Sequence, residues 1–136
     1  MALFGAIGIA GTGVTVYRKW LDAVSDNIAN MNDAAPTSGP AFQARYITAQ
    51  AVNYGSGEGG VEVGAAGLSG NTTGRVVYEP TNPLADADGN VRYPDIDLSD
   101  QMGQMIIAQR GYQANLAVVD RAHDAYQAAL QLGRNA

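Results

Sequence analysis

Two proline-free segments, one at each end, constrain the fold of this 136-residue chain most strongly. All five prolines lie between Pro36 and Pro94, so residues 1–35 and 95–136 can each form a long helix. In both segments, apolar residues recur at alternating steps of three and four, which is the heptad spacing of a coiled coil. A helix cannot bury such a stripe alone. We therefore expect a mainly α fold in which long N- and C-terminal helices form an antiparallel coiled coil.

The heptad spacing places a specific set of residues on the predicted seam. In the first helix these are Leu3, Ile7, Ala10, Val14, Tyr17, Leu21, Val24, Ile28 and Met31. In the second helix they are Leu98, Met102, Met105, Gln109, Tyr112, Leu116, Val119, His123, Tyr126, Leu130 and Gly133. His123 is a polar residue on this stripe, and we interpret it as fixing the register of the two helices. The alternatives for His123, pH sensing and catalysis, have no partner residue to support them.

The middle of the chain, residues 36–94, is rich in glycine and proline. We expect residues 1–35 and 95–136 to form one discontinuous helical domain around a middle region of short β-strands and loops. The candidate strands are residues 42–54, 60–64, 75–79 and 90–93. The last two are expected to form a hairpin through Asp88-Gly89. Residues 55–74 are expected to be a flexible loop between weak strands.

The composition excludes several classes of function. A net charge of −5 gives no electrostatic footprint for binding DNA or RNA. Without cysteine, and with His123 as the single histidine, the chain cannot form a disulfide, a zinc finger or a two-histidine metal helix. No nucleophile and base have a catalytic spacing, so we expect no enzyme, cofactor or small-molecule substrate. Only 15% of residues are charged, against about 25% in an average domain, which predicts large surfaces that a partner covers.

Two short motifs match binding sites only formally. Residues 55–60 fit the glycine pattern of a dinucleotide site, but the strand-like Val61-Glu62-Val63 follows where a helix is required. Residues 86–90 resemble part of a calcium loop, but Leu84 stands where the first ligand is required. We interpret both as loop sequences. The first cation, Arg18, follows the apolar start of the chain, which fits a cleaved signal peptide poorly, and no apolar window is long enough to span a membrane.

Three stretches together resemble the bacterial flagellar rod and hook family. Residues 25–33, SDNIANMND, are similar to the asparagine signature near the amino terminus of that family, and residues 109–115, QRGYQAN, to its carboxy-terminal signature. Residues 77–97, VYEPTNPLADADGNVRYPDID, are most similar to its proximal-rod members. The resemblance covers essentially the whole chain.

The resemblance implies a structural subunit of the flagellar basal-body rod that polymerises helically and transmits torque. Its implied partners are copies of itself, other rod proteins and the flagellar type III export apparatus, with export that leaves no cleaved signal peptide. The alternatives are another axial rod protein of the same family and, from a different class, a small secreted helical adaptor. The stretch at residues 77–97 discriminates against the other rod proteins.

We expect the assembly interface to include heptad and signature residues of both helices. These are Ile7, Val14, Tyr17, Leu21, Val24, Asn27, Ile28, Asn30, Met102, Met105, Tyr112, Asn115, Leu116, Val119, Tyr126 and Leu130. Asn27 and Asn30 lie three residues apart on one helix face. Two interpretations of this pair stay open: amide hydrogen bonds between subunits, or a simple helix stop.

Overall fold

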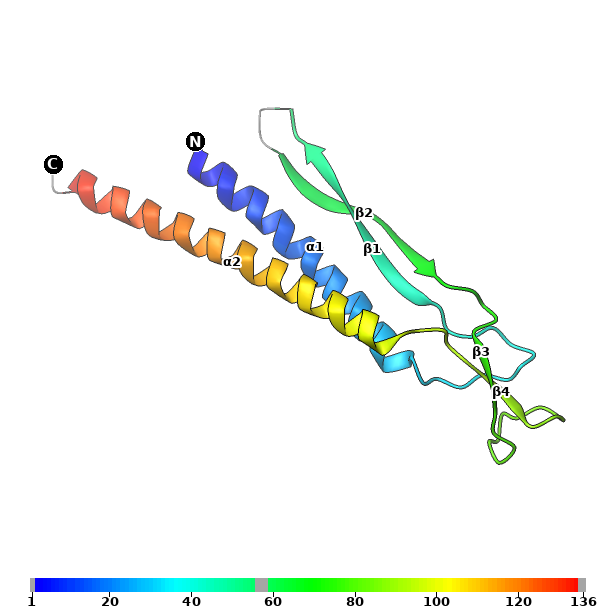
Figure 1. The fold of residues 1–136 in the computed structure, drawn as a ribbon. Coiled ribbons are helices and arrows are strands. Elements are labelled where there is room, and N and C mark those ends of the chain that lie inside the picture. The colour runs from blue at the N-terminus through cyan, green and yellow to red at the C-terminus, as the bar shows by residue number, and fades with distance from the viewer. Residues whose placement is uncertain (1, 56–58, 135–136) are drawn as a thin grey trace.

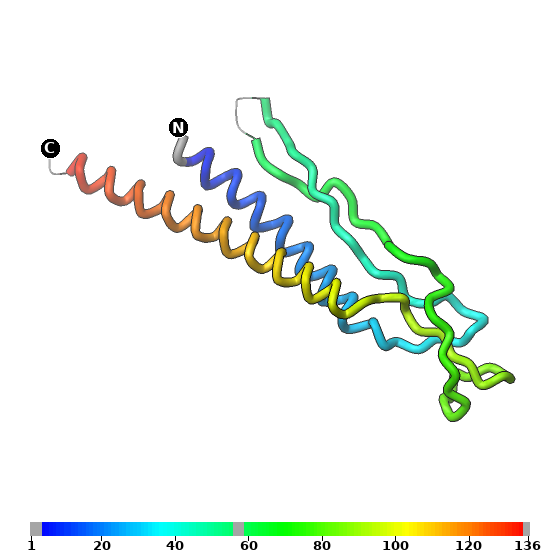
Figure 2. Tube along the Cα trace, in the orientation of Figure 1, coloured from blue at the N-terminus to red at the C-terminus, as the bar shows by residue number. Residues whose placement is uncertain are grey.

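The computed structural model describes residues 2–55 and 59–134, which form two long helices and two antiparallel hairpins (Figure 1). The helices are α1 (Ala2–Asn30) and α2 (Leu98–Arg134). The first hairpin consists of β1 (Ala44–Asn53) and β2 (Gly59–Ser69), and the second of β3 (Arg75–Tyr78) and β4 (Asn90–Tyr93). Figure 2 shows an elongated molecule in which the start of α1 and the end of α2 lie at one end and the β3–β4 hairpin at the other.

Helix α1 is the central element of the molecule. It packs along α2, which runs in the opposite direction, and it also packs against both strands of the β1–β2 hairpin. Among the described elements, α2 and the β1–β2 hairpin do not pack against each other. Because α1 contacts a neighbour on two sides, Val16, Ala23, Val24 and Asn27 are all buried.

The prediction of a mainly α chain is wrong. The β1–β2 hairpin has strands of 10 and 11 residues, which makes it a major element of the fold beside the helices. Its second strand occupies residues expected to be a flexible loop, and residues 56–58 of the dinucleotide-like motif lie outside the described part of the chain. The candidate strand at residues 60–64 is therefore present, but the sequence pattern did not predict its extension to Ser69, because the glycines and alanines there have low strand propensity. Pairing with β1 overrides that propensity, and Tyr46 lies over Gly67 on the neighbouring strand.

The face of α2 that packs against α1 is displaced by one residue from the predicted coiled-coil seam. The residues of α2 that face α1 are Gln101, Gln104, Ala108, Gly111, Asn115 and Ala122. Each of these precedes a predicted seam residue, so the true packing face is rotated by about 100° around the helix. His123 on the predicted seam is therefore exposed, and it lies beside Asp124 and Gln127 instead of between the helices.

The displacement follows from the bulk of the α1 side chains. Tyr17 and Trp20 stack with their ring centroids 6.0 Å apart, and the Trp20 Nε1 donates a hydrogen bond to Gln104. A Cβ at Gly111 would collide with the Tyr17 ring. The aromatic residues of α1 thus require small residues opposite them, and Met102, Leu116 and Leu130 of the bulky α2 stripe are left exposed.

The β3–β4 hairpin is confirmed as predicted, and the turn that joins its strands is held by side chains. Oδ1 of Asp86 accepts hydrogen bonds from the backbone N–H groups of Asp88 and Asn90, and Oδ2 accepts one from the Thr37 hydroxyl. The hydrogen bonds from Asn90 and Thr37 lower the pKa of Asp86. Gly89 completes the turn with a φ of 78°.

The molecule exposes far more surface than a compact protein of its size. Its accessible surface is 8803 Å², against about 6,700 Å² for a globular monomer of the same mass. The buried hydrophobic residues are mostly small: Ala10, Val16, Ala23, Val24, Ala41, Val91, Ala108 and Ala122. Large apolar side chains are correspondingly left on the surface.

The close approach of the two helices predicts opposite effects for two glycines of α2. We expect Gly111→Ala to lower the free energy of unfolding by about 1–3 kcal/mol, because the added methyl displaces the Tyr17 ring. The matched control is Gly103→Ala, because a Cβ at Gly103 meets no atom within 4 Å. That substitution should raise the free energy of unfolding by up to about 1 kcal/mol through helix propensity. Urea unfolding followed by circular dichroism measures both, and equal effects would contradict the packing described.

Candidate assembly surface

The side chain of Asn27 joins three elements of the fold. Its Nδ2 donates to Gln101 Oε1 on α2 at 2.8 Å and to the backbone carbonyl of Arg45 on β1 at 2.9 Å. Its Oδ1 accepts the Arg45 backbone N–H at 2.7 Å. The carboxamide therefore bonds to the edge of β1 as a neighbouring strand would. The side chain is almost fully buried, and its donors and acceptor are used within the chain.

The other polar residues of the asparagine signature close the end of α1. Asn30 Nδ2 donates to the backbone carbonyl of Asp26 at 2.8 Å and to its carboxylate at 3.1 Å. The Asp26 carboxylate also pairs with Arg45 at 2.9 Å. The bonds of Asn30 stay within the last turn of α1, and no described residue other than glycine has a positive φ, so Asn30 does not end the helix in the left-handed conformation. Asn27 is an internal anchor for the β1–β2 hairpin.

The carboxy-terminal signature serves the contact between the helices. Asn115 Nδ2 donates to the Gly111 carbonyl at 2.8 Å, and the Asn115 side chain lies against Gly13 of α1. Gly13 and Gly111 therefore both permit close packing. By contrast, Cβ atoms at Gly5, Gly8 and Gly11 would meet nothing within 4 Å.

Helix α2 begins at a side-chain cap. Oδ1 of Asp97 accepts the backbone N–H groups of Ser99 at 2.6 Å and Asp100 at 3.2 Å. The hydrogen bonds from Asp100 and Ser99 lower the pKa of the Asp97 carboxyl. The cap fixes where α2 starts, directly beyond the β3–β4 hairpin.

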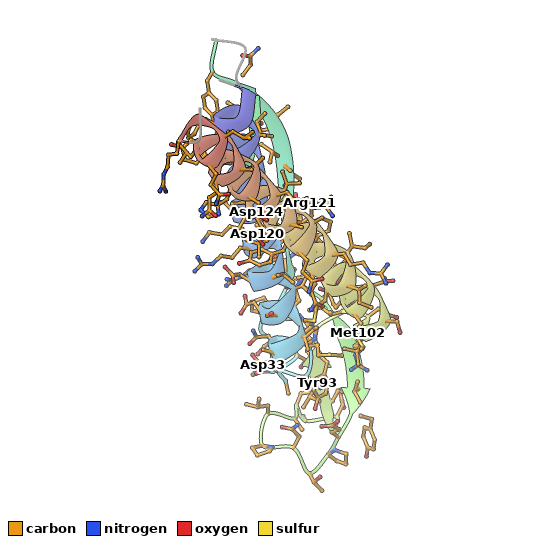
Figure 3. The ribbon with its side chains drawn as sticks, turned by 90° about the vertical axis from the view of Figure 1, so that its left-hand side faces the viewer. Asp33, Tyr93, Met102, Asp120, Arg121 and Asp124 are labelled. Atoms are coloured by element: carbon orange, nitrogen blue, oxygen red, sulfur yellow. The ribbon has the colours of Figure 1, made fainter. Side chains whose placement is uncertain are left out.

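Part of the apolar stripe of α2 lies on the outside of the helix pair. Met102, Leu116, Tyr126 and Leu130 are exposed, with 53% of Met102 and 51% of Leu130 accessible. Figure 3 shows Met102 near the start of α2 and the charged residues Asp120, Arg121 and Asp124 farther along it. Apart from the aromatic contact of Tyr126 with Phe4, at 5.6 Å between centroids, no described element covers the exposed members of this stripe.

The predicted interface residues therefore fall into three groups. Val24 and Asn27 are buried within the chain. Half-buried are Ile7, Val14, Tyr17, Leu21, Ile28, Asn30, Met105, Tyr112, Asn115 and Val119. Exposed are Met102, Leu116, Tyr126 and Leu130.

The last turns of α2 extend past the start of α1. Phe4 of α1 lies opposite Tyr126, and Ala122 is the last buried residue of α2. Beyond that point Leu130 and Leu132 are exposed, Leu132 to 74%. Within the described part of the chain, these leucines bury little apolar surface, so packing adds little to the stability of this helix end.

Sequence reasoning missed the polar residues that hold the hairpin. Arg45 was not singled out, nor was Thr12, whose hydroxyl accepts the Val61 backbone N–H at 3.0 Å. The sequence did not indicate Gln101 as a buried residue, because a glutamine between apolar residues of a helix is normally interpreted as exposed. Its burial depends on Asn27, which lies 74 positions earlier in the chain.

Neither helix of the described chain has an apolar stretch sufficient to cross a bilayer. Within the same residues, no group of histidine and acidic side chains is arranged to hold a metal ion.

Comparison with known proteins gives a consistent set of relatives. Residues 87–132 match the family model described as "Flagellar basal body rod FlgEFG protein C-terminal". The chain is 33% identical to the flagellar basal-body rod protein FlgC of Salmonella typhimurium, covering 98% of this chain and 100% of the relative. It is 35% identical to FlgC of Escherichia coli O6:H1, with the same coverage. It is 32% identical to FlgC of Borreliella burgdorferi, over 97% of this chain and 98% of the relative.

The junction at Asn27 predicts a large effect of removing one side chain. We expect Asn27→Ala to lower the free energy of unfolding by about 2–4 kcal/mol, because the Arg45 N–H and the Gln101 side chain lose their buried partner. Amide hydrogen exchange should accelerate at Arg45 in particular. Asn32→Ala is the control, because Asn32 is exposed, and its effect should stay within about 0.5 kcal/mol. Equal effects of the two changes would show that Asn27 is not an anchor.

The cap of α2 predicts a pH-dependent contribution to stability. Because the folded pKa of Asp97 is lowered, its ionised cap stabilises the fold above the unfolded pKa of about 3.9. That contribution is lost as the pH falls through the folded value. Asp97→Asn keeps a capping side chain without the charge, so its melting temperature should lie below that of the parent at pH 6 and converge with it near pH 2. A difference that stays constant with pH would contradict this account.

Proposed function

The chain belongs to the family of flagellar basal-body rod proteins FlgC, and on that premise we propose that the exposed apolar stripe of α2 is its main contact with neighbouring subunits. As a member of this family, the protein is a structural subunit of the flagellar basal-body rod. It assembles with other rod proteins, and its place is the basal body.

The observation that carries the proposal is the apolar surface left open along α2. The elongated molecule as a whole exposes about 2,000 Å² more than a compact monomer of its mass, and α2 carries many of the exposed large apolar side chains. Leu98, Met102, Ile106 and Leu116 belong to this open surface. Neighbouring subunits that cover this surface would bury its apolar side chains, and that burial would add to the limited stability that the small core of the monomer supplies.

The contact is heterologous and generates a helical polymer. The α2 stripe is apolar along one helix, whereas the opposite side of α1 carries the β1–β2 hairpin, so the two sides of a subunit differ. A repeated contact between two different surfaces produces an open helical assembly when its rotation does not close. Such a polymer transmits torque along its axis because each subunit is held by several neighbours.

Export of the subunit proceeds through the flagellar type III apparatus without a cleaved signal peptide. The absence of cysteine suits passage as an unfolded chain. The alanine-rich core suits it as well, since few large side chains must be extracted from the interior before export.

Charge placed on the exposed stripe tests the proposal. We expect the double variant Met102→Asp, Leu116→Asp to remain folded, because both side chains are exposed in the monomer. It should nevertheless be absent from isolated basal bodies and abolish motility, because two carboxylates would be buried at the subunit contact. Immunoblots of basal bodies and swimming assays measure these outcomes.

The matched control is the double variant Ala117→Asp, Ala128→Asp, which places the same two charges at exposed positions of α2 outside the predicted stripe. This variant should assemble and support motility. Normal assembly of the Met102→Asp, Leu116→Asp variant would overturn the role of the stripe, and circular dichroism of each purified variant separates a folding defect from an assembly defect.

A further inference from the structure

The β1–β2 hairpin is a two-stranded sheet, and among the described residues its outer edges bond to α1 at two positions. On the edge of β1, the N–H and carbonyl of Arg45 bond to the Asn27 side chain. On the edge of β2, the N–H of Val61 bonds to the Thr12 hydroxyl. Helix α1 therefore reaches the two edges from Thr12 and from Asn27, which are well separated along the helix, and it leaves a free stretch on each edge.

The two anchors reveal which backbone groups point outward. In an antiparallel ladder, positions alternate between pairs that exchange hydrogen bonds and pairs whose backbone groups point away. Arg45 and Val61 belong to the outward set. Counting along the register then places Ile47, Ala49 and Ala51 on the free edge of β1. The outward positions of β2 are the register partners of the outward positions of β1. They are Leu68 and Ala66 on one side of the register shift at Thr48 and Ala49, and Val63 on the other side.

Apart from the register shift at Thr48 and Ala49, neither free stretch carries the features that normally protect a sheet edge. Proteins guard exposed edges with lysine, proline or other charged residues. Residues 47–51 and 63–68 contain no charged residue and no proline. Most of their side chains are also small, so another strand can approach without obstruction. The register shift opposite Thr48 and Ala49 is the one irregularity, and it adds twist to the sheet at this point.

We propose that the free edge of β1 in one subunit pairs antiparallel with the free edge of β2 in the next copy of this chain. Each edge offers three outward positions, so the donors and acceptors match in number. The neighbouring copy is the favoured occupant because β1 and β2 already run antiparallel within a subunit. Copies in the same orientation therefore present complementary strands to one another, and the sheet continues from subunit to subunit.

Pairing of β2 with β2 would satisfy the same backbone groups but would make a closed dimer with no further growth. Pairing of β1 with β2 of the next copy leaves one edge of each kind free at the ends of the assembly. Further copies can therefore be added, as a rod subunit requires. The inference rests on the proposed polymerisation and adds a backbone-mediated contact to the apolar contact of α2.

Cysteine pairs test this contact, because the chain has no cysteine of its own. In the fully overlapping register Ala49 of one copy lies opposite Ala66 of the next, at the separation of about 5.5 Å that a disulfide spans. Cells that lack the native copy co-express the Ala49→Cys and Ala66→Cys chains, distinguished by tags of different size. Isolated basal bodies are then oxidised with copper–phenanthroline and separated on non-reducing gels. Each cysteine is on a separate chain, so every mixed dimer is intermolecular.

The control replaces Ala49→Cys by Gln50→Cys, because a shift of one residue turns the side chain to the opposite face of the sheet. We expect the mixed dimer of the 49/66 pair to exceed that of the 50/66 pair by at least about tenfold. Dimers formed between two Ala66→Cys chains would overturn the proposal in favour of a closed pair. Basal bodies that contain both chains but no 49/66 dimer would overturn the edge contact alone, whereas absence of the chain from basal bodies would overturn the proposed function as well.

Discussion

The structure depends on the burial of α1 between two elements that do not pack on each other. The carboxamide of Asn27 is where this arrangement is fixed, since it bonds to Gln101 of α2 and to both backbone groups of Arg45 on β1. A buried amide with all its partners in place stabilises the fold, whereas the same amide without them would oppose it. The side chain thus selects one position of the hairpin relative to the helix pair.

The helix pair is built for close approach and not for a large core. Gly13 and Gly111 admit the side chains of Asn115 and Tyr17, and the buried positions of α2 besides Gln101 are alanines. Small residues bring the two backbones together but bury little apolar area for each residue. The large apolar side chains are consequently placed on the outside, where neighbouring rod subunits can cover them.

This distribution explains the unusual composition of the chain. A charged fraction of 15% would leave a monomer poorly solvated, yet a rod subunit exposes only part of its surface once it has assembled. The acidic residues that remain serve local structure in several places. Asp86 and Asp97 accept backbone N–H groups at a turn and a helix start, and Glu79 accepts the Tyr93 hydroxyl, which raises the pKa of Tyr93.

The sequence by itself determined the two terminal helices, the β3–β4 hairpin and the family. Those features depend on local patterns: the absence of proline, heptad spacing, the Asp-Gly turn and three motifs. Only the tertiary structure decided which face of α2 meets α1, and that the strand candidate at residues 60–64 extends over residues 59–69 and pairs with β1. A heptad repeat sets the spacing of residues along a helix but not which face of the helix turns toward its partner. Here the bulk of Tyr17 and the polarity of Asn27 select the small and polar face of α2. The strand at 59–69 depends on its partner β1, because its glycines and alanines become ordered only when another strand pairs with them.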